Sequence, residues 1–221
     1  MVDKLSDPIG RLMGLRYKSH PWHGVSIGKN APHEVTAFIE VVSTDTVKYE
    51  IDKESGYLRV DRPQKFSNVI PALYGFIPQT FCGIKVGKFC NEKTGKANIT
   101  GDGDPIDICV LTEKTLAHGD LLVNARPIGG FRMIDGNQAD DKIIAVLLND
   151  TVYGHFKEIH EVPDVVIQRL EHYFLTYKDM PGQHSNTEIA AIYNSEEAFQ
   201  VIELSMEDYN KRFDNLGKLL G

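Results

Sequence analysis

The first two-thirds of the chain carries its hydrophobic residues in short runs, either alternating with polar residues or continuous, and both patterns are typical of β-strands. Segments rich in Gly, Asp, Ser and Lys, such as Lys53–Gly56, separate these runs and predict turns. Six strands are predicted here, at Ala37–Val42, Val47–Asp52, Tyr57–Arg62, Asp107–Leu111, Leu121–Pro127 and Lys142–Leu148.

The period of the hydrophobic positions changes near the end of the chain. Within Asp164–Lys178 the apolar residues recur at helical spacing, which predicts a helix. A second helix is expected to begin at Asn194, because Glu197 three residues later resembles a capping box. One face of this helix carries an apolar stripe, which we interpret as core: Phe199, Ile202, Met206, Tyr209 and Phe213.

The chain has no internal repeat and no low-complexity linker, and its 221 residues lie within the range of one large domain. We therefore expect a single domain over residues 1–221. Residues 1–35 show neither strand nor helix periodicity and are interpreted as an irregular N-terminal arm. Strands followed by helices indicate a mainly β fold with α, in which a small β-barrel is flanked by C-terminal helices.

The charge balance is acidic, with 31 Asp and Glu against 24 Lys and Arg and a formal net charge of −7. This argues against a nucleic-acid partner, since such a protein needs a basic face to neutralise phosphates. No apolar run approaches a membrane span or a signal peptide, so we expect a cytoplasmic protein without a membrane partner. The cysteines Cys82, Cys90 and Cys109 are expected to be reduced, with a Cys82–Cys90 disulfide as the alternative.

The most informative motif is the run Asp102–Asp107, in which three carboxylates fall within six residues around a Gly and a Pro, just before a predicted strand. Such crowding is unfavourable because like charges raise each other's pKa, and a hard divalent cation such as Mg²⁺ relieves it. A solvated acidic loop is the simpler interpretation. An EF-hand is excluded, because Asp107 stands where that loop needs Gly and Pro105 interrupts it.

Two further clusters change the interpretation of this acidic run. One is acidic and follows later in the chain, at Asp135 and Asp140–Lys142. The other is cationic and phenolic, and its members are Lys48, Arg62, Tyr74, Tyr177 and Lys178. Carboxylates for metal ions together with Lys, Arg and Tyr donors are what a multiply charged phosphate substrate requires. The eight histidines lack zinc-ligand spacing, so a zinc protease-like site is not expected.

In their order along the chain, these clusters resemble the motifs of family I soluble inorganic pyrophosphatases. The spans that carry the resemblance are Phe38–Glu40, Lys48–Glu54, Val60–Arg62, Tyr74–Phe76, Gly101–Asp107, Asp135–Lys142 and Tyr177–Asp179. The resemblance implies an OB-like five-stranded β-barrel with C-terminal helices. It also implies hydrolysis of pyrophosphate to two phosphates by metal-activated water, with several Mg²⁺ per site and Mn²⁺ or Zn²⁺ as substitutes.

The resemblance also assigns roles to single residues. Asp104 is similar to the residue that accepts the proton of the attacking water. The implied metal ligands are Asp102, Asp107 and Asp140 for the tight metal, Asp107 again for the second, and Asp135 with Asp140 for metal arriving with substrate, with Glu40 nearby. The implied substrate ligands are Lys48 and Tyr74 for the phosphate under attack, Arg62, Tyr177 and Lys178 for the leaving phosphate, and Lys142 as an added positive charge.

Three departures from the family pattern stand out. Ile70 occupies a position where many bacterial members carry Tyr, and Gly136 follows Asp135 where Glu is common. Residues 80–100 are longer than in compact bacterial members, and their lysines predict an exposed basic loop at the mouth of the site. By analogy with the bacterial members we expect a homo-oligomer, with a hexamer ahead of a dimer.

Two other functions compete with this interpretation. A metal-dependent phosphohydrolase that acts on an organic di- or triphosphate would share the aspartates. A non-enzymatic OB-type binding protein would instead need a basic groove with exposed stacking aromatics, whereas the candidate site is crowded with carboxylates.

Overall fold

The computed structural model describes residues 18–64, 69–182 and 185–220, with side chains described as far as Phe213. The first seventeen residues of the predicted arm lie outside the described residues. The remainder, 18–34, forms turns without helix or strand, as expected for this part of the arm.

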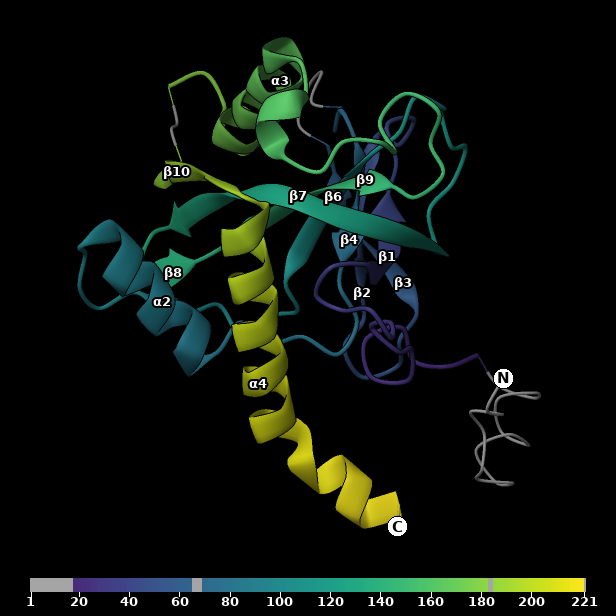
Figure 1. Ribbon diagram of the computed structural model, residues 1–221, viewed down its shortest axis with the longest axis vertical. Coiled ribbons are helices and arrows are strands. Elements are labelled where there is room, and N and C mark those ends of the chain that lie inside the picture. Colours follow the sequence, from purple (N-terminus) through teal and green to yellow (C-terminus); the bar gives the residue numbers. More distant parts are fainter. Residues whose placement is uncertain (1–17, 65–68, 183–184, 221) are drawn as a thin grey trace.

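Five strands form a closed ring at the centre of the molecule (Figure 1). In ring order they are β1 (Val35–Val41), β4 (Leu73–Phe76), β6 (Asp107–Leu111), β9 (Lys142–Leu147) and β7 (Leu121–Asp135), which pairs with β1 again. All neighbours in the ring are antiparallel except β6 and β9, which are parallel. The predicted OB-like β-barrel with C-terminal helices is confirmed.

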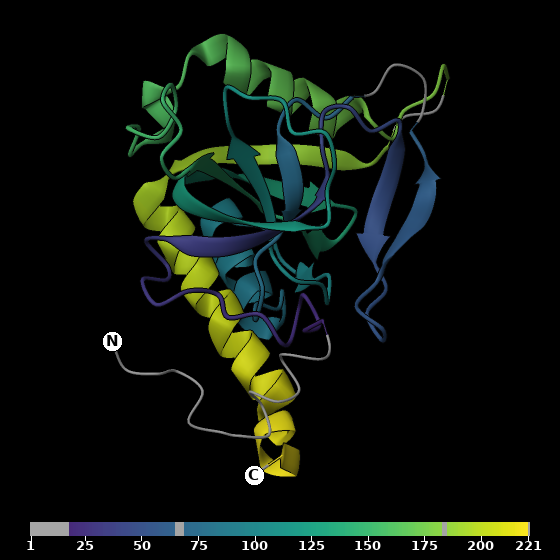
Figure 2. The same ribbon diagram turned by 90° about the vertical axis from the view of Figure 1, so that its right-hand side faces the viewer.

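Shorter elements extend this ring on two sides. The long strand β7 also pairs with β8 (Gln138–Ala139) and with β10 (Thr187–Asn194), and β8 pairs with β5 (Thr100–Gly101). The strands β2 (Val47–Ile51) and β3 (Leu58–Pro63) form a separate hairpin that stands beside the barrel (Figure 2).

Helices cover the barrel on two sides (Figure 1). The helix α3 (Asp164–Thr176), preceded by the short 3₁₀ helix η1 (Ile159–Glu161), packs Leu170 and Phe174 into one core cluster. The long helix α4 (Ser195–Leu220) packs against β7 and against α2 (Ile84–Thr94). The helix was predicted to begin at Asn194 and begins one residue later, with Asn194 as its cap: the Asn194 Oδ1 accepts the N–H of Glu197 at 3.1 Å.

Most strand predictions hold, and one has the same bounds as β6. The strand predicted at Leu121–Pro127 continues to Asp135, because Gly129 and Gly130 leave room for β10 and the Tyr193 ring to lie against it. The strands β4, β5, β8 and β10 were not predicted, because their runs are short or interrupted by polar residues.

The prediction of an exposed basic loop over 80–100 is wrong, because most of this segment is the helix α2. Val86 and Cys90 lie one helical turn apart and are buried, while the lysines that suggested a loop face outward. The Asp208 carboxylate of α4 caps the helix from outside by accepting the N–H groups of Lys85 and Val86, at 2.8 and 3.2 Å. Cys82, Cys90 and Cys109 are all free and buried, so the alternative disulfide does not form.

Candidate active site

A cavity of about 240 Å³ opens between the β2–β3 hairpin, the barrel and the end of α3. Its walls are mainly ionisable. The acidic lining is Glu40, Glu50, Asp102, Asp104, Asp107, Asp135 and Asp140. The cationic and phenolic lining is Lys48, Lys53, Lys142, Lys178, Tyr74 and Tyr177. The fold thus gathers every residue for which the sequence predicts a role, with the exception of Arg62.

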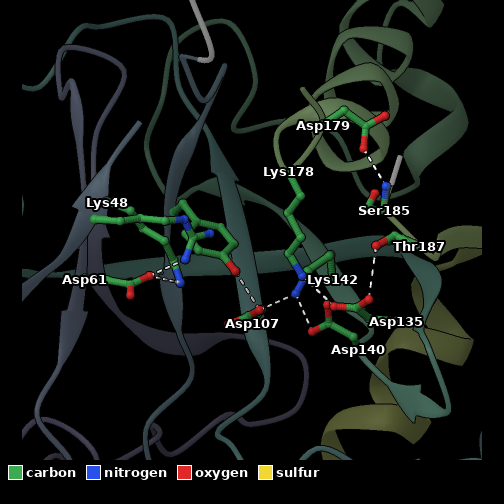
Figure 3. A network of polar contacts seen from close by, with 12 residues as sticks. Lys48, Asp61, Asp107, Asp135, Asp140, Lys142, Lys178, Asp179, Ser185 and Thr187 are labelled. Atoms are coloured by element: carbon green, nitrogen blue, oxygen red, sulfur yellow. Dashed lines mark hydrogen bonds and ion pairs between the residues drawn. The ribbon is translucent and has the colours of Figure 1, made fainter. Parts of the chain in front are cut away.

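The register of β6 and β9 brings the middle of the site together. Asp107 and Lys142 are paired residues at the starts of these two parallel strands, although they are 35 residues apart in the chain. The Lys142 amine donates to Asp107 and to Asp140 Oδ1, the latter at 2.5 Å (Figure 3). Tyr74 on the neighbouring strand β4 donates its hydroxyl to Asp107 Oδ2 at 2.6 Å. Asp107 therefore accepts from two residues and Lys142 joins two carboxylates.

The acidic run folds into a tight turn that holds its carboxylates at the mouth of the barrel. The Asp104 N–H donates to Asp102 Oδ1 at 2.9 Å, and Gly103 adopts a φ of 83°, which favours glycine. Cys82 fixes the turn from outside, because its N–H donates to the Asp104 carbonyl at 2.7 Å and its carbonyl accepts from Gly103 at 3.0 Å. The Asp104 side chain lines the cavity, is 41% exposed and contacts the Lys53 amine.

Burial perturbs several of the carboxylates. Burial, together with the neighbouring Asp140, raises the pKa of Asp102 to about 7. Burial raises the pKa of Glu40 to about 8, although the Ile51 N–H donates to its Oε1 at 2.7 Å. Burial also raises the pKa of Asp140, and the Lys142 amine opposes that shift. Burial therefore disfavours the charged form of these three carboxyl groups in the protein without bound cations.

This donor set fits a hard divalent cation, because it consists of carboxylate oxygens in a partly buried, negatively charged hollow. Among the described residues, however, no three His, Cys, Asp or Glu side chains are gathered closely enough to chelate an ion as they stand. Lys142 explains this spacing at the centre of the site, since its amine lies between Asp107 and Asp140. The carboxylate oxygens are therefore of the right type for a metal ion, but Asp107 and Asp140 are spaced to pair with the Lys142 amine.

The cations at the two edges of the cavity are each held by a carboxylate. On the hairpin, Lys48 Nζ lies 3.2 Å from Asp61 Oδ2, and Arg62, paired with Lys48 across the strands, donates to the same oxygen at 2.5 Å. Arg62 therefore lies beside the cavity and does not line it. At the opposite edge Lys178 donates to Asp135 Oδ2 at 2.5 Å (Figure 3).

Three polar residues that line the cavity had no predicted role: Glu50, Lys53 and Gln138. Glu50 and Lys53 lie in the span Lys48–Glu54 that carried the resemblance, so their position next to Lys48 was an available signal. Gln138 likewise lies in the span Asp135–Lys142 that carried the resemblance, and the short pairing of β8 with β5 and β7 holds it in place.

The two single-residue departures have structural explanations. Ile70 is 1% exposed and belongs to the core cluster that includes Phe174, so an apolar side chain fits there. Gly136 adopts a φ of 62° in the turn between β7 and β8, a conformation that favours glycine.

Comparisons with known proteins agree with this geometry. A sequence profile of the family described as inorganic pyrophosphatase matches residues 37–210. The inorganic pyrophosphatase of Chlamydia trachomatis serovar D is 48% identical over 200 residues, which cover 88% of this chain and 96% of that protein. The soluble inorganic pyrophosphatase of Oryza sativa subsp. japonica is 37% identical over 193 residues, or 86% of this chain and 79% of that protein.

Solved structures give the same result for the fold. The inorganic pyrophosphatase of Thermus thermophilus superposes with a TM-score of 0.71 at 28% identity, covering 87% of this chain and 99% of that one. The type I inorganic pyrophosphatase of P. falciparum gives a TM-score of 0.74 at 23% identity, covering 91% of this chain and 66% of that one, and is compared for fold alone.

Proposed function

The chain belongs to the inorganic pyrophosphatase family, and from this premise we propose that the cavity hydrolyses pyrophosphate with Mg²⁺ held by its aspartates. Members of this family are metal-dependent enzymes. The observation that carries the proposal for this site is the β6–β9 register, which places Asp107 beside Lys142 in a hollow rich in carboxylates. A dianionic or more highly charged phosphate needs such a combination of metal ligands and cationic donors.

We assign the metal-ligand role to Glu40, Asp102, Asp107, Asp135 and Asp140. When bound, the divalent cations supply Lewis-acid chemistry, polarising phosphoryl oxygens and lowering the pKa of water. Mn²⁺ or Zn²⁺ are proposed as substitutes for Mg²⁺. The support for these assignments is that all five carboxylates line one cavity and that burial raises the pKa of Asp102, Asp140 and Glu40.

The remaining steps belong to side chains of this chain. Lys48 and Tyr74 bind the phosphate under attack, and Lys178 with Tyr177 binds the leaving phosphate from the other edge of the cavity. Arg62, beside the cavity, is proposed to join the leaving phosphate, and Lys142 adds positive charge at the centre. Asp104 accepts the proton of the attacking water on its carboxylate, which is exposed at the mouth of the cavity.

The decisive assay is phosphate release from pyrophosphate by the pure protein, with and without Mg²⁺. Mg²⁺ is expected to support turnover. Ca²⁺ is expected to bind the same oxygens and inhibit, since it is larger and takes looser geometries. Equal rates with both ions would contradict the proposal. Faster hydrolysis of ATP, ADP or another organic phosphate would favour the alternative function.

The assembly and the cellular location are also proposals. We propose a single domain over residues 1–221 that forms a homo-oligomer in the cytoplasm, with a hexamer ahead of a dimer, by analogy with the family. Among the described residues, none of the helices is long and apolar enough to cross a membrane. Light scattering at micromolar concentration tests the assembly, and a mass near the chain mass of 24.8 kDa would contradict it.

A further inference from the structure

A second charged cluster lies on the far side of the segment Asp140–Lys142 and is largely shielded from solvent. It consists of Arg132, Asp141, Tyr193 and Glu197. Arg132 of β7 has a side chain that is 1% exposed, and it donates from Nε and Nη2 to Asp141 Oδ2 at 3.3 and 3.1 Å. The Asp141 side chain is 2% exposed. The same Asp141 oxygen accepts the Tyr193 hydroxyl at 3.1 Å, and Arg132 Nη1 donates to Glu197 at 2.9 Å.

This cluster is separate from the cavity, since none of its four residues lines it. Its place in the chain nevertheless joins it to the site. Asp141 stands between Asp140 and Lys142, which both line the cavity and contact each other there. Asp141 turns the other way, toward Arg132. In the segment Asp140–Lys142, the first and last side chains therefore contact groups in the cavity, and the middle one contacts Arg132 on the opposite side of the backbone.

Four elements hold the cluster in one arrangement. The Arg132 guanidinium lies over the rings of Phe89 in α2 and Tyr193 in β10, at 4.9 and 5.0 Å. The Tyr193 ring is fixed in turn by Gly130, where a Cβ would lie 2.5 Å from its atoms. Glu197 of α4 is held by the Lys93 amine at 2.6 Å. Asp141 has little freedom to move relative to the barrel.

Stability does not account for such a pair. Taking two charges out of water is costly, and apolar residues of similar volume in their place often leave a protein equally stable or more stable. One Asp141 oxygen, Oδ1, is buried without a hydrogen-bond partner among the described residues, which adds to the cost. What the guanidinium provides instead is a fixed direction, because its Nε and Nη2 converge on one Asp141 oxygen.

We propose that Arg132 and Asp141 are positioning residues, which pin the segment Asp140–Lys142 from behind so that the Asp140 carboxylate and the Lys142 amine point into the cavity. This proposal rests on the function proposed above for that cavity. Groups behind a metal site that orient its ligands commonly contribute ~10–100-fold to metal affinity or activity.

The test is a double substitution, R132M/D141L, which removes both charges and keeps the volume. Glu197 keeps the Lys93 amine, so no charge is left unpaired, but the buried Tyr193 hydroxyl loses its acceptor. The two effects oppose each other, so the free energy of unfolding in urea is expected to stay close to that of the wild type. Mg²⁺ affinity measured by calorimetry, without substrate, is expected to fall ~10–100-fold, and kcat with pyrophosphate by a similar factor. The matched control is K85M/E207L, which removes an exposed ion pair whose residues do not line the cavity and should change neither Mg²⁺ affinity nor kcat.

Wild-type Mg²⁺ affinity and kcat in a folded R132M/D141L protein would overturn the proposal. If that protein fails to fold, Asp141→Asn is the second variant. It keeps the size of the side chain and an oxygen that can accept the Tyr193 hydroxyl, and it removes the negative charge that attracts the Arg132 guanidinium. In that variant the same loss of Mg²⁺ affinity is expected, measured on protein whose circular dichroism is native, and an unchanged affinity would also overturn the proposal. Calorimetry measures Mg²⁺ affinity without substrate, so it tests the positioning role even if the wild type does not hydrolyse pyrophosphate. A failure of the proposed function can thus be distinguished from a failure of the positioning proposal.

Discussion

The segment between β8 and β9 meets charged groups on both sides, and the two sides are built differently. On the cavity side seven carboxylates face four lysines in a hollow open to solvent. On the opposite side Arg132 and Asp141 are buried and meet Glu197, and the exposed Lys93 completes a set with two charges of each sign. The excess of negative charge in front suits groups that exchange partners with cations and substrate. The balanced charges around Arg132 and Asp141 suit groups that keep the same partners.

The largest effect is expected from Asp104, on the cavity side. Asp104→Asn should lower kcat by ~10²–10⁴, the usual loss when a general base is removed, while the free energy of unfolding stays the same because the side chain is exposed. Steady-state kinetics and urea unfolding measure the two quantities. Glu54→Gln is the control, an exposed carboxylate on the same hairpin as Lys53 that does not line the cavity. A similar kcat for both variants would contradict the assignment.

The turn of the acidic run also has an uncharged support, at Thr80, which is fully buried. Its hydroxyl accepts the Ile106 N–H at 3.0 Å and donates to the Ile77 carbonyl at 2.6 Å. Thr80→Val keeps the shape and leaves that N–H unpaired, so it should lower the free energy of unfolding by ~1–3 kcal/mol.

Thr80→Ser provides the control for this substitution, because it keeps the hydroxyl. It should therefore retain most of the stability that Thr80→Val loses in urea unfolding. A Thr80→Val protein as stable as the wild type would show that the turn does not depend on this hydroxyl. In that case the buried Arg132–Asp141 pair, and not Thr80, would hold the backbone of the site in place.

A smaller effect of opposite sign is expected at Asp102. Crowding of its buried carboxylate by Asp140 disfavours the metal-free protein, so Asp102→Asn should raise the free energy of unfolding in EDTA by about 1 kcal/mol. The new side chain can still accept the Asp104 N–H through Oδ1. Added Mg²⁺ should stabilise the variant less than the wild type, since one of the proposed ligands is lost. Lower stability in EDTA would mean that the crowding on this side carries no cost.

The features that could be predicted from the sequence are those set by residues close together in the chain. The run Asp102–Asp107 could be recognised because its carboxylates are neighbours in the chain, and the strand Asp107–Leu111 because its apolar run is uninterrupted. The helix α2 was missed because its lysines outweighed the two buried positions Val86 and Cys90. Long-range contacts decide what local patterns leave open.

The contrast between Asp140 and Asp141 illustrates this limit. The sequence shows two adjacent aspartates in a turn, and nothing local says that one faces the cavity and the other a buried arginine. That difference depends on the pairing of β7 with β10, which brings Tyr193 to the far side of the segment. Arg132 carried no signal at all, since a single arginine in a strand is usually exposed.

The smallest effect is expected at an ion pair that has the same chemistry as the one behind the site but lies in solvent. Lys96 contacts Glu188, and both side chains are nearly half exposed, at 45% and 48%. A double-mutant cycle of Lys96→Ala and Glu188→Ala in urea should give a coupling of ~0.2–1 kcal/mol, because water screens the charges and both side chains lose freedom when they pair. About 1 M NaCl should abolish most of it, since the screening length is then only ~3 Å. The buried pair Arg132–Asp141, measured by the same cycle, should give a larger coupling that salt hardly changes. If the surface pair couples as strongly as the buried one, or resists salt equally, then burial does not distinguish the fixed network from the rest of the charged surface.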